Sequence, residues 1–261
     1  MTSISYFTRG LSNEFLKLKR TFAFWLTIIS AFFIPCIYLL VYLFKTEAMI
    51  PAEGVNPWGN FIGYQIRAIV PFLLPMFIIL VTSLIIQVEH KSNAVKHLFT
   101  LPVPKWSIYF GKLTIVITSI FFAFALFYVV VILFGYLVGT IHPELKLTEF
   151  TPEYTKSIKV VFRAFIAALG MVSLQFWLSF RIKNFIIPLG IGMVMMITGL
   201  VVYRGSEAIY FPYAYNMLSL FPADKDIESM LWFPTVSMYS IGYFLLFTII
   251  GYIDIKRKNI T

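Results

Sequence analysis

The residues of this chain that could do chemistry are few and far apart. His90 and His97 lie in one polar loop and His142 in another, which we expect on the opposite side of a membrane, so the three do not predict a metal site. The sequence contains no H-E-x-x-H and no G-x-S-x-G motif, and no two acids fall within its long apolar stretches. The residue types and their spacing therefore predict no catalytic site and no bound metal.

Gly111-Lys112 is the one pair that resembles a nucleotide-binding motif, the end of a phosphate-binding loop. Such a loop needs Ser or Thr after the lysine and a glycine five residues before the second glycine, and here these positions are Leu113 and Trp106. We therefore expect that this chain binds no cofactor itself. Any ATP and Mg²⁺ would be bound by a second polypeptide.

Arg163 is the one charged residue within the apolar stretches. A charge at mid-bilayer costs about 2.5–3.5 kcal/mol, so we expect the arginine to extend past Lys159 toward the membrane surface. The alternative is that Arg163 contacts an anionic substrate or a lipid headgroup.

The composition places the chain in a membrane. Hydrophobic residues make up 59% of the sequence and charged residues 13%, with a mean hydropathy of +0.84, whereas a soluble domain carries about 25% charged residues. The single cysteine, Cys36, permits no disulfide within the chain. The polar residues 1–21 do not form a signal peptide, and we expect one transmembrane domain over residues 1–261.

Six apolar stretches are long enough to cross the hydrocarbon core as helices. They cover residues 22–44, 68–88, 113–141, 160–180, 185–203 and 231–253. The predicted fold is therefore an all-α integral membrane protein with six transmembrane helices. Pro71 and Pro75 predict a kink in the second of them, and Gly135 and Gly139 are spaced for close helix packing in the third.

The orientation of the spans follows from the basic residues. The loops and termini on one side carry 13 Lys and Arg residues against three acids, and those on the other side carry seven against nine. Because basic residues collect in cytoplasmic loops, both termini are expected in the cytoplasm. This asymmetry accounts for most of the net charge of +9, with anionic membrane lipids as counter-ions, and nucleic-acid binding is not predicted.

Residues 1–21 predict an amphipathic helix before the first span. Apolar residues recur at helical spacing, and the charged residues Glu14, Lys17 and Arg20 lie mostly off this stripe. The stripe consists of Ile4, Phe7, Leu11, Phe15 and Leu18. We expect this elbow helix to lie in the headgroup plane and to turn sharply into the first span.

Residues 89–112 form a basic loop between the second and third spans. The sequence predicts two short helices separated at Pro102-Val103-Pro104, because each proline disfavours the helical conformation of the residue before it. About two dozen patterned residues are more than a simple connection needs. We therefore expect a docking surface for a cytosolic protein, the alternative being a connector that lies on the membrane.

Residues 204–230 form the longest segment on the outer side. The uncharged part, residues 208–223, is aromatic and too short and proline-broken to span, so we expect a re-entrant or interfacial segment. Tyr210, Phe211 and Tyr213 are candidate substrate or lipid contacts there. Asp224, Asp226 and Glu228 are interpreted as a solvated turn, because their spacing lacks the features of a calcium loop.

Two motifs in this layout resemble a known family. Residues 14–20 read EFLKLKR, and the loop from Glu89 runs through residues 98–102, LFTLP, to Gly111-Lys112. With six spans and both ends inside, the chain resembles the permease subunits of type-2 ABC transporters. Among these it is most similar to the bacitracin and lantibiotic (antimicrobial peptide) resistance or self-immunity permeases.

The resemblance implies that the loop is a coupling helix which docks into the ATP-binding subunit, with Leu98, Leu101 and Pro102 as buried contacts. The candidate docking residues are Glu89, Lys91, Lys96, His97, Leu98, Leu101, Pro102, Val103, Pro104 and Lys105. The elbow helix with Glu14, Lys17 and Arg20 would tilt with it as ATP is bound.

The family pattern also implies the partners. Two ATP-binding subunits would bind a pair of permease chains, identical or sister, in a bacterial cytoplasmic membrane. The cargo would be amphipathic or hydrophobic, an antimicrobial peptide or a lipid-like compound, moved outward. Two other classes remain open: an ATP-independent secondary transporter or channel, and a membrane anchor that recruits a cytosolic protein.

Overall fold

The computed structural model describes residues 3–91, 104–221 and 232–257, and these residues contain helices and no strand. The α-helices are α1 (Ser3–Lys19), α2 (Phe22–Phe44), α3 (Trp58–Ala68), α4 (Leu74–Lys91), α6 (Lys105–Ile141), α7 (Tyr154–Arg181), α8 (Ile186–Val202), α9 (Tyr215–Leu220) and α11 (Thr235–Arg257). Short 3₁₀ helices are η1 (Thr46–Met49), η3 (Pro143–Leu145), η4 (Ser206–Tyr210) and η5 (Pro212–Ala214), and η2 (Ile69–Leu73) is a π-helical turn. The predicted all-α class is confirmed.

Five helical stretches are long and apolar enough to cross a membrane: Phe22–Phe44, Trp58–Gln87, Lys105–Ile141, Tyr154–Arg181 and Thr235–Arg257. The protein is therefore a multi-pass membrane protein. The sixth stretch, α8, is equally apolar but has 17 residues, about 25 Å at 1.5 Å per residue. The count of six spans remains a prediction.

The helices begin earlier than the apolar stretches do. The second spanning stretch starts at Trp58 rather than at residue 68, because Asn60, Gln65 and Arg67 interrupt the apolar run without ending the helix. The third starts at Lys105 rather than at residue 113. Residues 105–112, expected as a separate short helix, are the first two turns of α6.

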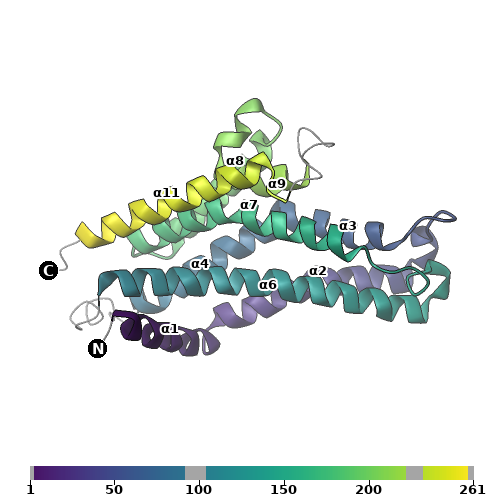
Figure 1. The fold of residues 1–261 in the computed structure, drawn as a ribbon, viewed down its shortest axis with the longest axis horizontal. Helices are drawn as coiled ribbons and strands as arrows, with labels where there is room; N and C mark the ends of the chain where they lie inside the picture. The colour runs from purple at the N-terminus through teal and green to yellow at the C-terminus, as the bar shows by residue number, and fades with distance from the viewer. Residues whose placement is uncertain (1–2, 92–103, 222–231, 258–261) are drawn as a thin grey trace.

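Figure 1 shows α2, α6, α7 and α11 running along the long axis of the molecule, with both chain ends at the same end of the bundle. Helix α11 packs along α7, α2 packs along α6, and α4 packs against α7. Helix α1 lies beside the beginning of α6 (Figure 1). Shared placement of the two termini agrees with the predicted topology; the compartment they face remains a prediction.

A two-residue break, Arg20-Thr21, separates α1 from α2. Thr21 is extended, with φ −110° and ψ 158°, and its hydroxyl donates to the carbonyl oxygen of Leu18 at 2.8 Å. This extended residue lets the chain change direction between Lys19 and Phe22. The predicted amphipathic helix is thus present as α1, and its position in the headgroup plane remains a prediction.

The second spanning stretch passes through a π-helical turn at Ile69–Leu73. Pro71 lies within it and Pro75 lies four residues later. Neither proline has a backbone N–H to donate to the residue four positions before it, which weakens the α-helical pattern at this point. At the place where the two prolines predict a kink, the helix therefore contains a π turn, a frequent site of helix bending.

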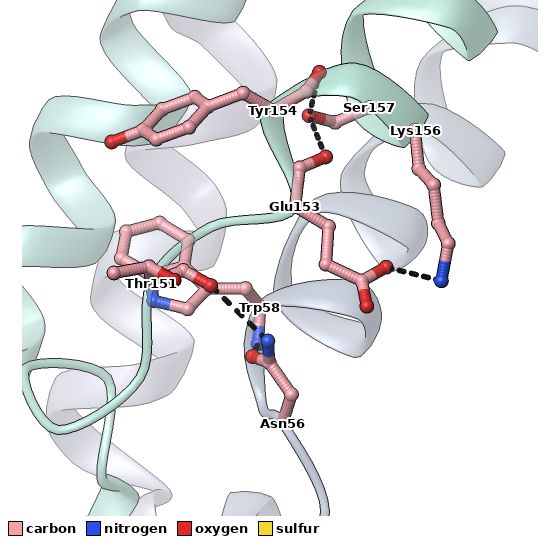
Figure 2. A network of polar contacts seen from close by, with 7 residues as sticks. All are labelled: Asn56, Trp58, Thr151, Glu153, Tyr154, Lys156 and Ser157. Atoms are coloured by element: carbon pink, nitrogen blue, oxygen red, sulfur yellow. Dashed lines mark hydrogen bonds and ion pairs between the residues drawn. The ribbon is translucent and has the colours of Figure 1, made fainter.

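The beginnings of α3 and α7 lie close to a network of polar contacts (Figure 2). The indole N–H of Trp58 is shared between the carbonyl oxygens of Leu147, at 2.9 Å, and Phe150, at 3.0 Å. Asn56 donates to the carbonyl oxygen of Thr151 at 3.1 Å. Gly135 lets α6 approach this site, because a Cβ there would lie 2.4 Å from the Trp58 ring. The loop after α6 is thereby fixed onto α3.

Candidate functional site at the end that carries both termini

The predicted docking loop lies only partly within the described residues. Lys96, His97, Leu98, Leu101, Pro102 and Val103 lie outside them. Helix α4 continues through Glu89 to Lys91, and Pro104 directly precedes α6. The loop therefore joins the end of α4 to the beginning of α6.

A buried ion pair joins α1 to the beginning of α6. The ammonium group of Lys112 donates to Oε2 of Glu14 at 2.8 Å, and the side chains are 1% and 14% exposed. Lys17 donates to the other carboxylate oxygen of Glu14 at 2.7 Å. A lysine this deeply buried needs such a partner, because an unpaired buried charge is very costly. Arg20, the third predicted elbow residue, is exposed.

The lysines control the ionisation of Glu14. Burial of its carboxyl group acts to raise the pKa, but the charges and hydrogen bonds of Lys112 and Lys17 together outweigh burial and hold the pKa below its ordinary value. The carboxylate is therefore ionised at neutral pH. The contact between α1 and α6 is a charged hydrogen bond, stronger than a neutral one.

Tyr109 holds the same part of α6 against the C-terminal helices. Its side chain is 0% exposed, and its hydroxyl donates to the carbonyl oxygen of Thr248 in α11 at 3.0 Å. Its ring lies 5.2 Å from that of Phe176 and 5.9 Å from that of Phe180, both in α7. The first turns of α6 are thus packed between α1 on one side and α7 and α11 on the other.

Two polar contacts at the helix ends complete this region. Arg181, the last residue of α7, donates to the carboxylate of Asp254 in α11. Lys105, the first residue of α6, donates to the carbonyl oxygen of Lys256 at 3.3 Å. The start of α6 therefore contacts α1 on one side and the end of α11 on the other, directly after Pro104, where the chain leaves the predicted docking loop (Figure 1).

The segment after α8 packs into the bundle. Tyr213 is 2% exposed, and its hydroxyl donates to Oε1 of Gln175 in α7 at 2.7 Å. Gln175 in turn donates to the carbonyl oxygen of Pro188 in α8 at 3.0 Å. Tyr210 is 58% exposed, and Phe211 is half-buried with its ring 6.0 Å from that of Tyr213. Of the three predicted aromatic contacts, only Tyr210 presents most of its side chain outward.

Arg163 is 7% exposed. The residue is therefore covered by other parts of the protein, and its expected extension past Lys159 toward the membrane surface remains a prediction. Lys159, one turn earlier, lies with its Nζ 5.7 Å from the centre of the Trp232 ring. A role for Arg163 in binding cargo or lipid remains a prediction.

An apolar cavity of about 250 Å³ lies between α2, η2, α4, α6 and α7. Its lining includes Phe33, Leu74, Phe77, Ala123 and Phe127, and almost none of its surface is polar. It lies beside the π turn, since Ile69, Val70 and Leu73 also line it. The cavity can take an apolar group and offers no partner for a charged one.

Lys112 and Tyr109 are the site residues that sequence reasoning missed. Lys112 stood out as part of an incomplete phosphate-binding motif and as the end of the loop that carries the family resemblance, and Tyr109 as one aromatic among many. The signal that could have found Lys112 is a lysine bordering a long apolar stretch, since such a charge needs a partner. The sequence does not show that this partner is Glu14, which lies 98 residues earlier.

Comparison with known proteins identifies one family. The model of the family described as ABC-2 family transporter protein matches residues 10–199. That range contains Glu14, Lys112 and α2 through most of α8. No match was found among curated proteins, and none among solved structures.

Proposed function

Since this chain belongs to the ABC-2 family of transporter proteins, and is therefore the membrane permease subunit of an ABC transporter, we propose that it serves an ATP-driven exporter. The cargo would be an amphipathic or hydrophobic compound taken from the cytoplasm or the membrane. The observation that carries this proposal is the family match over residues 10–199. Five apolar helices of spanning length agree with it.

ATP would be hydrolysed in a separate subunit. The only sequence that resembles a phosphate-binding motif ends at Lys112, whose ammonium group is buried and bonded to Glu14. A lysine held in this way is not presented to a nucleotide, which supports binding of ATP and Mg²⁺ by the partner.

The partner would dock at the end of the bundle that carries both termini, through residues 89–105. This end holds α1, the ends of α4 and α11 and the start of α6 (Figure 1). We place it in the cytoplasm because of its excess of Lys and Arg. Two ATP-binding subunits and a second permease chain, identical or sister, would complete the transporter in a bacterial cytoplasmic membrane.

The apolar cavity supports a hydrophobic cargo. Pockets for such ligands are lined mainly by apolar side chains, and this cavity between α2, η2, α4, α6 and α7 has that character. An antimicrobial peptide or a lipid-like compound would satisfy the requirement. The outward direction is part of the proposal.

The first experiment is purification of the tagged protein from its native membrane in mild detergent. The proposal predicts that an ATP-binding subunit copurifies in stoichiometric amount. Leu101→Asp should abolish this association while membrane insertion is kept, because a charge buried in an apolar cleft is costly. Ile50→Asp is the matched control, since Ile50 is 52% exposed at the outer end. Normal association of Leu101→Asp would contradict docking through the loop.

The cargo is tested with inside-out vesicles containing the whole complex and a fluorescent amphipathic peptide. ATP-dependent uptake into the vesicles is expected for an exporter. Ala123→Phe, which fills the cavity at a position 7% exposed, should reduce uptake, whereas Ala125→Phe on the exposed face of the same helix should not. If Ala123→Phe takes up the peptide as fast as the wild type and Ala125→Phe do, the cavity is not part of the transport path.

A further inference from the structure

Another cavity, of about 130 Å³, lies at the end of the bundle away from both termini (Figure 1). It is formed where the end of α2, η1 and the loop after it, the beginning of α3, and η3 come together. None of the residues that line it is Asp, Glu, Lys or Arg. Its lining includes Tyr42, Asn60, Phe61, Tyr64, Leu145 and Leu147.

The wall that η3 and the following residues supply is held in place by several contacts. The carbonyl oxygen of Leu147 accepts the indole N–H of Trp58 at 2.9 Å. A Cβ on Gly139 in α6 would lie 2.8 Å from Cβ of Leu147, so α6 packs directly against this wall. Lys146 is left-handed, with φ 55°, and Leu145 and Leu147 on either side of it are 1% and 0% exposed. The cavity is therefore formed before any ligand binds, which lowers the cost of binding.

Tyr42 brings a buried hydroxyl group to this cavity. The residue is 4% exposed, and its hydroxyl makes no hydrogen bond to any of the described residues. A purely apolar ligand would leave this group buried without a partner, which is costly. Asn60 and the 40% exposed Tyr64 add an amide and a second hydroxyl to the lining. The cavity therefore suits a small polar ligand.

The aromatic rings decide the charge of that ligand. The rings of Tyr42 and Phe61 lie 4.9 Å apart at 63° to one another, so they form adjacent walls and not a stack, and Tyr64 supplies a third ring. The face of an aromatic ring is negative, so it attracts a cation and repels an anion. A carboxylate or phosphate would also find no Lys or Arg side chain in the lining. These features favour a small cation.

We propose that this cavity is a binding site for a primary ammonium group. The group donates hydrogen bonds to the hydroxyl of Tyr42 and the amide oxygen of Asn60, and it lies against the rings of Phe61 and Tyr64. A primary ammonium group has three N–H donors, whereas a quaternary one has none and would leave the Tyr42 hydroxyl without a partner.

Two sources carry this chemistry: a free small amine, and an ethanolamine lipid headgroup at the end of the spanning helix α2. The cavity shares no residue with the proposed docking loop or with the apolar cavity. The inference therefore goes beyond the proposed function and does not depend on it.

The test measures thermal unfolding of the full-length permease alone, in nanodiscs of phosphatidylglycerol, with increasing ethanolamine at constant ionic strength. Ethanolamine is protonated at neutral pH and should raise the melting temperature until the site is saturated, because a ligand that binds only the folded state stabilises it. Ethylene glycol, in which a hydroxyl replaces the ammonium group, should have no effect, and choline should bind more weakly. Equal stabilisation by either compound would overturn the assignment of a primary ammonium group.

Two pairs of variants locate the site. Tyr42→Phe keeps the ring and removes the hydroxyl, and it should weaken ethanolamine binding by about tenfold, a size typical of a lost hydrogen bond to a charged group. Tyr38→Phe, one turn earlier in α2 and outside the lining, should bind like the wild type. Ala48→Phe, at an exposed position of the lining, should fill the cavity and abolish binding, whereas Val55→Phe, 48% exposed and outside the lining, should not.

The variants also state what would overturn the site. Wild-type affinity in Tyr42→Phe, or in Ala48→Phe, would show that ethanolamine binds elsewhere. If Tyr42→Phe does not fold, Ala48→Phe still decides, because its side chain is exposed and its substitution removes no buried contact.

The lipid distinguishes the two sources. In phosphatidylethanolamine nanodiscs, a bound headgroup should already stabilise the wild type relative to Tyr42→Phe, more than in phosphatidylglycerol, and should remove the response to added ethanolamine. An equal response in both lipids would assign the site to a free amine. No response to ethanolamine in phosphatidylglycerol would overturn the proposal. Absence of an ATP-binding subunit from the purified protein would contradict the proposed function and leave this site unaffected.

Discussion

The hydroxyl group of Tyr109 in α6 occupies the space that a side chain at Gly251 in α11 would need. A Cβ on Gly251 would lie 2.4 Å from this oxygen and 3.2 Å from Cδ1 of Trp177. The same hydroxyl donates to the carbonyl oxygen of Thr248. The close approach of α6 and α11 therefore depends on the absence of a side chain at residue 251.

Gly251→Ala should destabilise the protein by about 1–3 kcal/mol, since an added methyl group in a packed site forces its neighbours apart. The measurement is thermal unfolding in detergent. Gly242→Ala is the matched control in the same helix, because a Cβ there meets no atom within 4 Å. This control should be slightly stabilising, by about 0.5–1 kcal/mol, because alanine favours the helix. In a Tyr109→Phe background, Gly251→Ala should cost less; an unchanged cost would contradict the role of the hydroxyl.

Gly199→Ala should separate η5 from α8. A Cβ at this position would lie 2.7 Å from the carbonyl oxygen of Tyr213 and 2.8 Å from its carbonyl carbon. These are backbone atoms, so η5 has to shift as a whole, and we expect a cost of about 1–3 kcal/mol. Gly190→Ala, with no atom within 4 Å, is the control. Equal melting temperatures for the two variants would show that η5 does not pack against Gly199 as described.

Trp58→Phe should loosen the loop over residues 142–153. The substitution removes the N–H donor shared by the carbonyl oxygens of Leu147 and Phe150, which costs about 1–3 kcal/mol for buried acceptors left without a partner. Hydrogen exchange of this loop should become faster. Trp25→Phe, at a position 59% exposed, should leave the exchange unchanged. Faster exchange in both variants would point to a general loss of stability.

Glu14 should make stability depend on pH in the acidic range. Its pKa in the folded protein lies below its ordinary value because Lys112 and Lys17 outweigh burial, so the folded state holds a proton less readily than the unfolded state. This contribution is complete above the unfolded pKa of about 4.3 and is lost as the pH falls through the folded pKa.

The measurement is the melting temperature between neutral pH and the acidic range. Glu14→Gln should be less stable at neutral pH, and the difference from the wild type should shrink as the pH falls. Glu153→Gln, which removes an exposed ion pair with Lys156 at 2.8 Å, is the control and should differ little from the wild type, because exposed pairs contribute little. A constant difference between Glu14→Gln and the wild type would contradict this account.

The spanning helices could be predicted because about 20 apolar residues in a row have no other stable state in a bilayer. The helix of the first predicted span has the bounds predicted for the span, Phe22–Phe44. The helices that contain the second and third predicted spans begin earlier than the spans do, since a helix can continue through polar residues such as Gln65 and Lys112. Apolar runs mark the membrane-embedded part of a helix and do not mark its ends.

The contacts between helices could not be predicted in the same way. Glu14 and Lys112 both border apolar stretches, but only the folded chain brings them within 2.8 Å. Tyr213 and Gln175 form a similar pair, and nothing in the spacing of their neighbours relates them. The separation of each pair along the chain is set by helix lengths and loop paths, which no local pattern records.

The π turn at Ile69–Leu73 places one additional residue in the helix that runs from Trp58 to Lys91. One residue corresponds to about 100° of rotation about the helix axis. Phe61, Ile62 and Ile66 are buried before the turn, and Val70, Leu74 and Ile78 are buried from the turn onward. Converting the turn to regular α-helix would therefore rotate one half of this helix against the other while both halves stay helical. The walls of the apolar cavity, to which Ile66, Val70 and Leu74 all contribute, can thus be rearranged by a twist in a single helix.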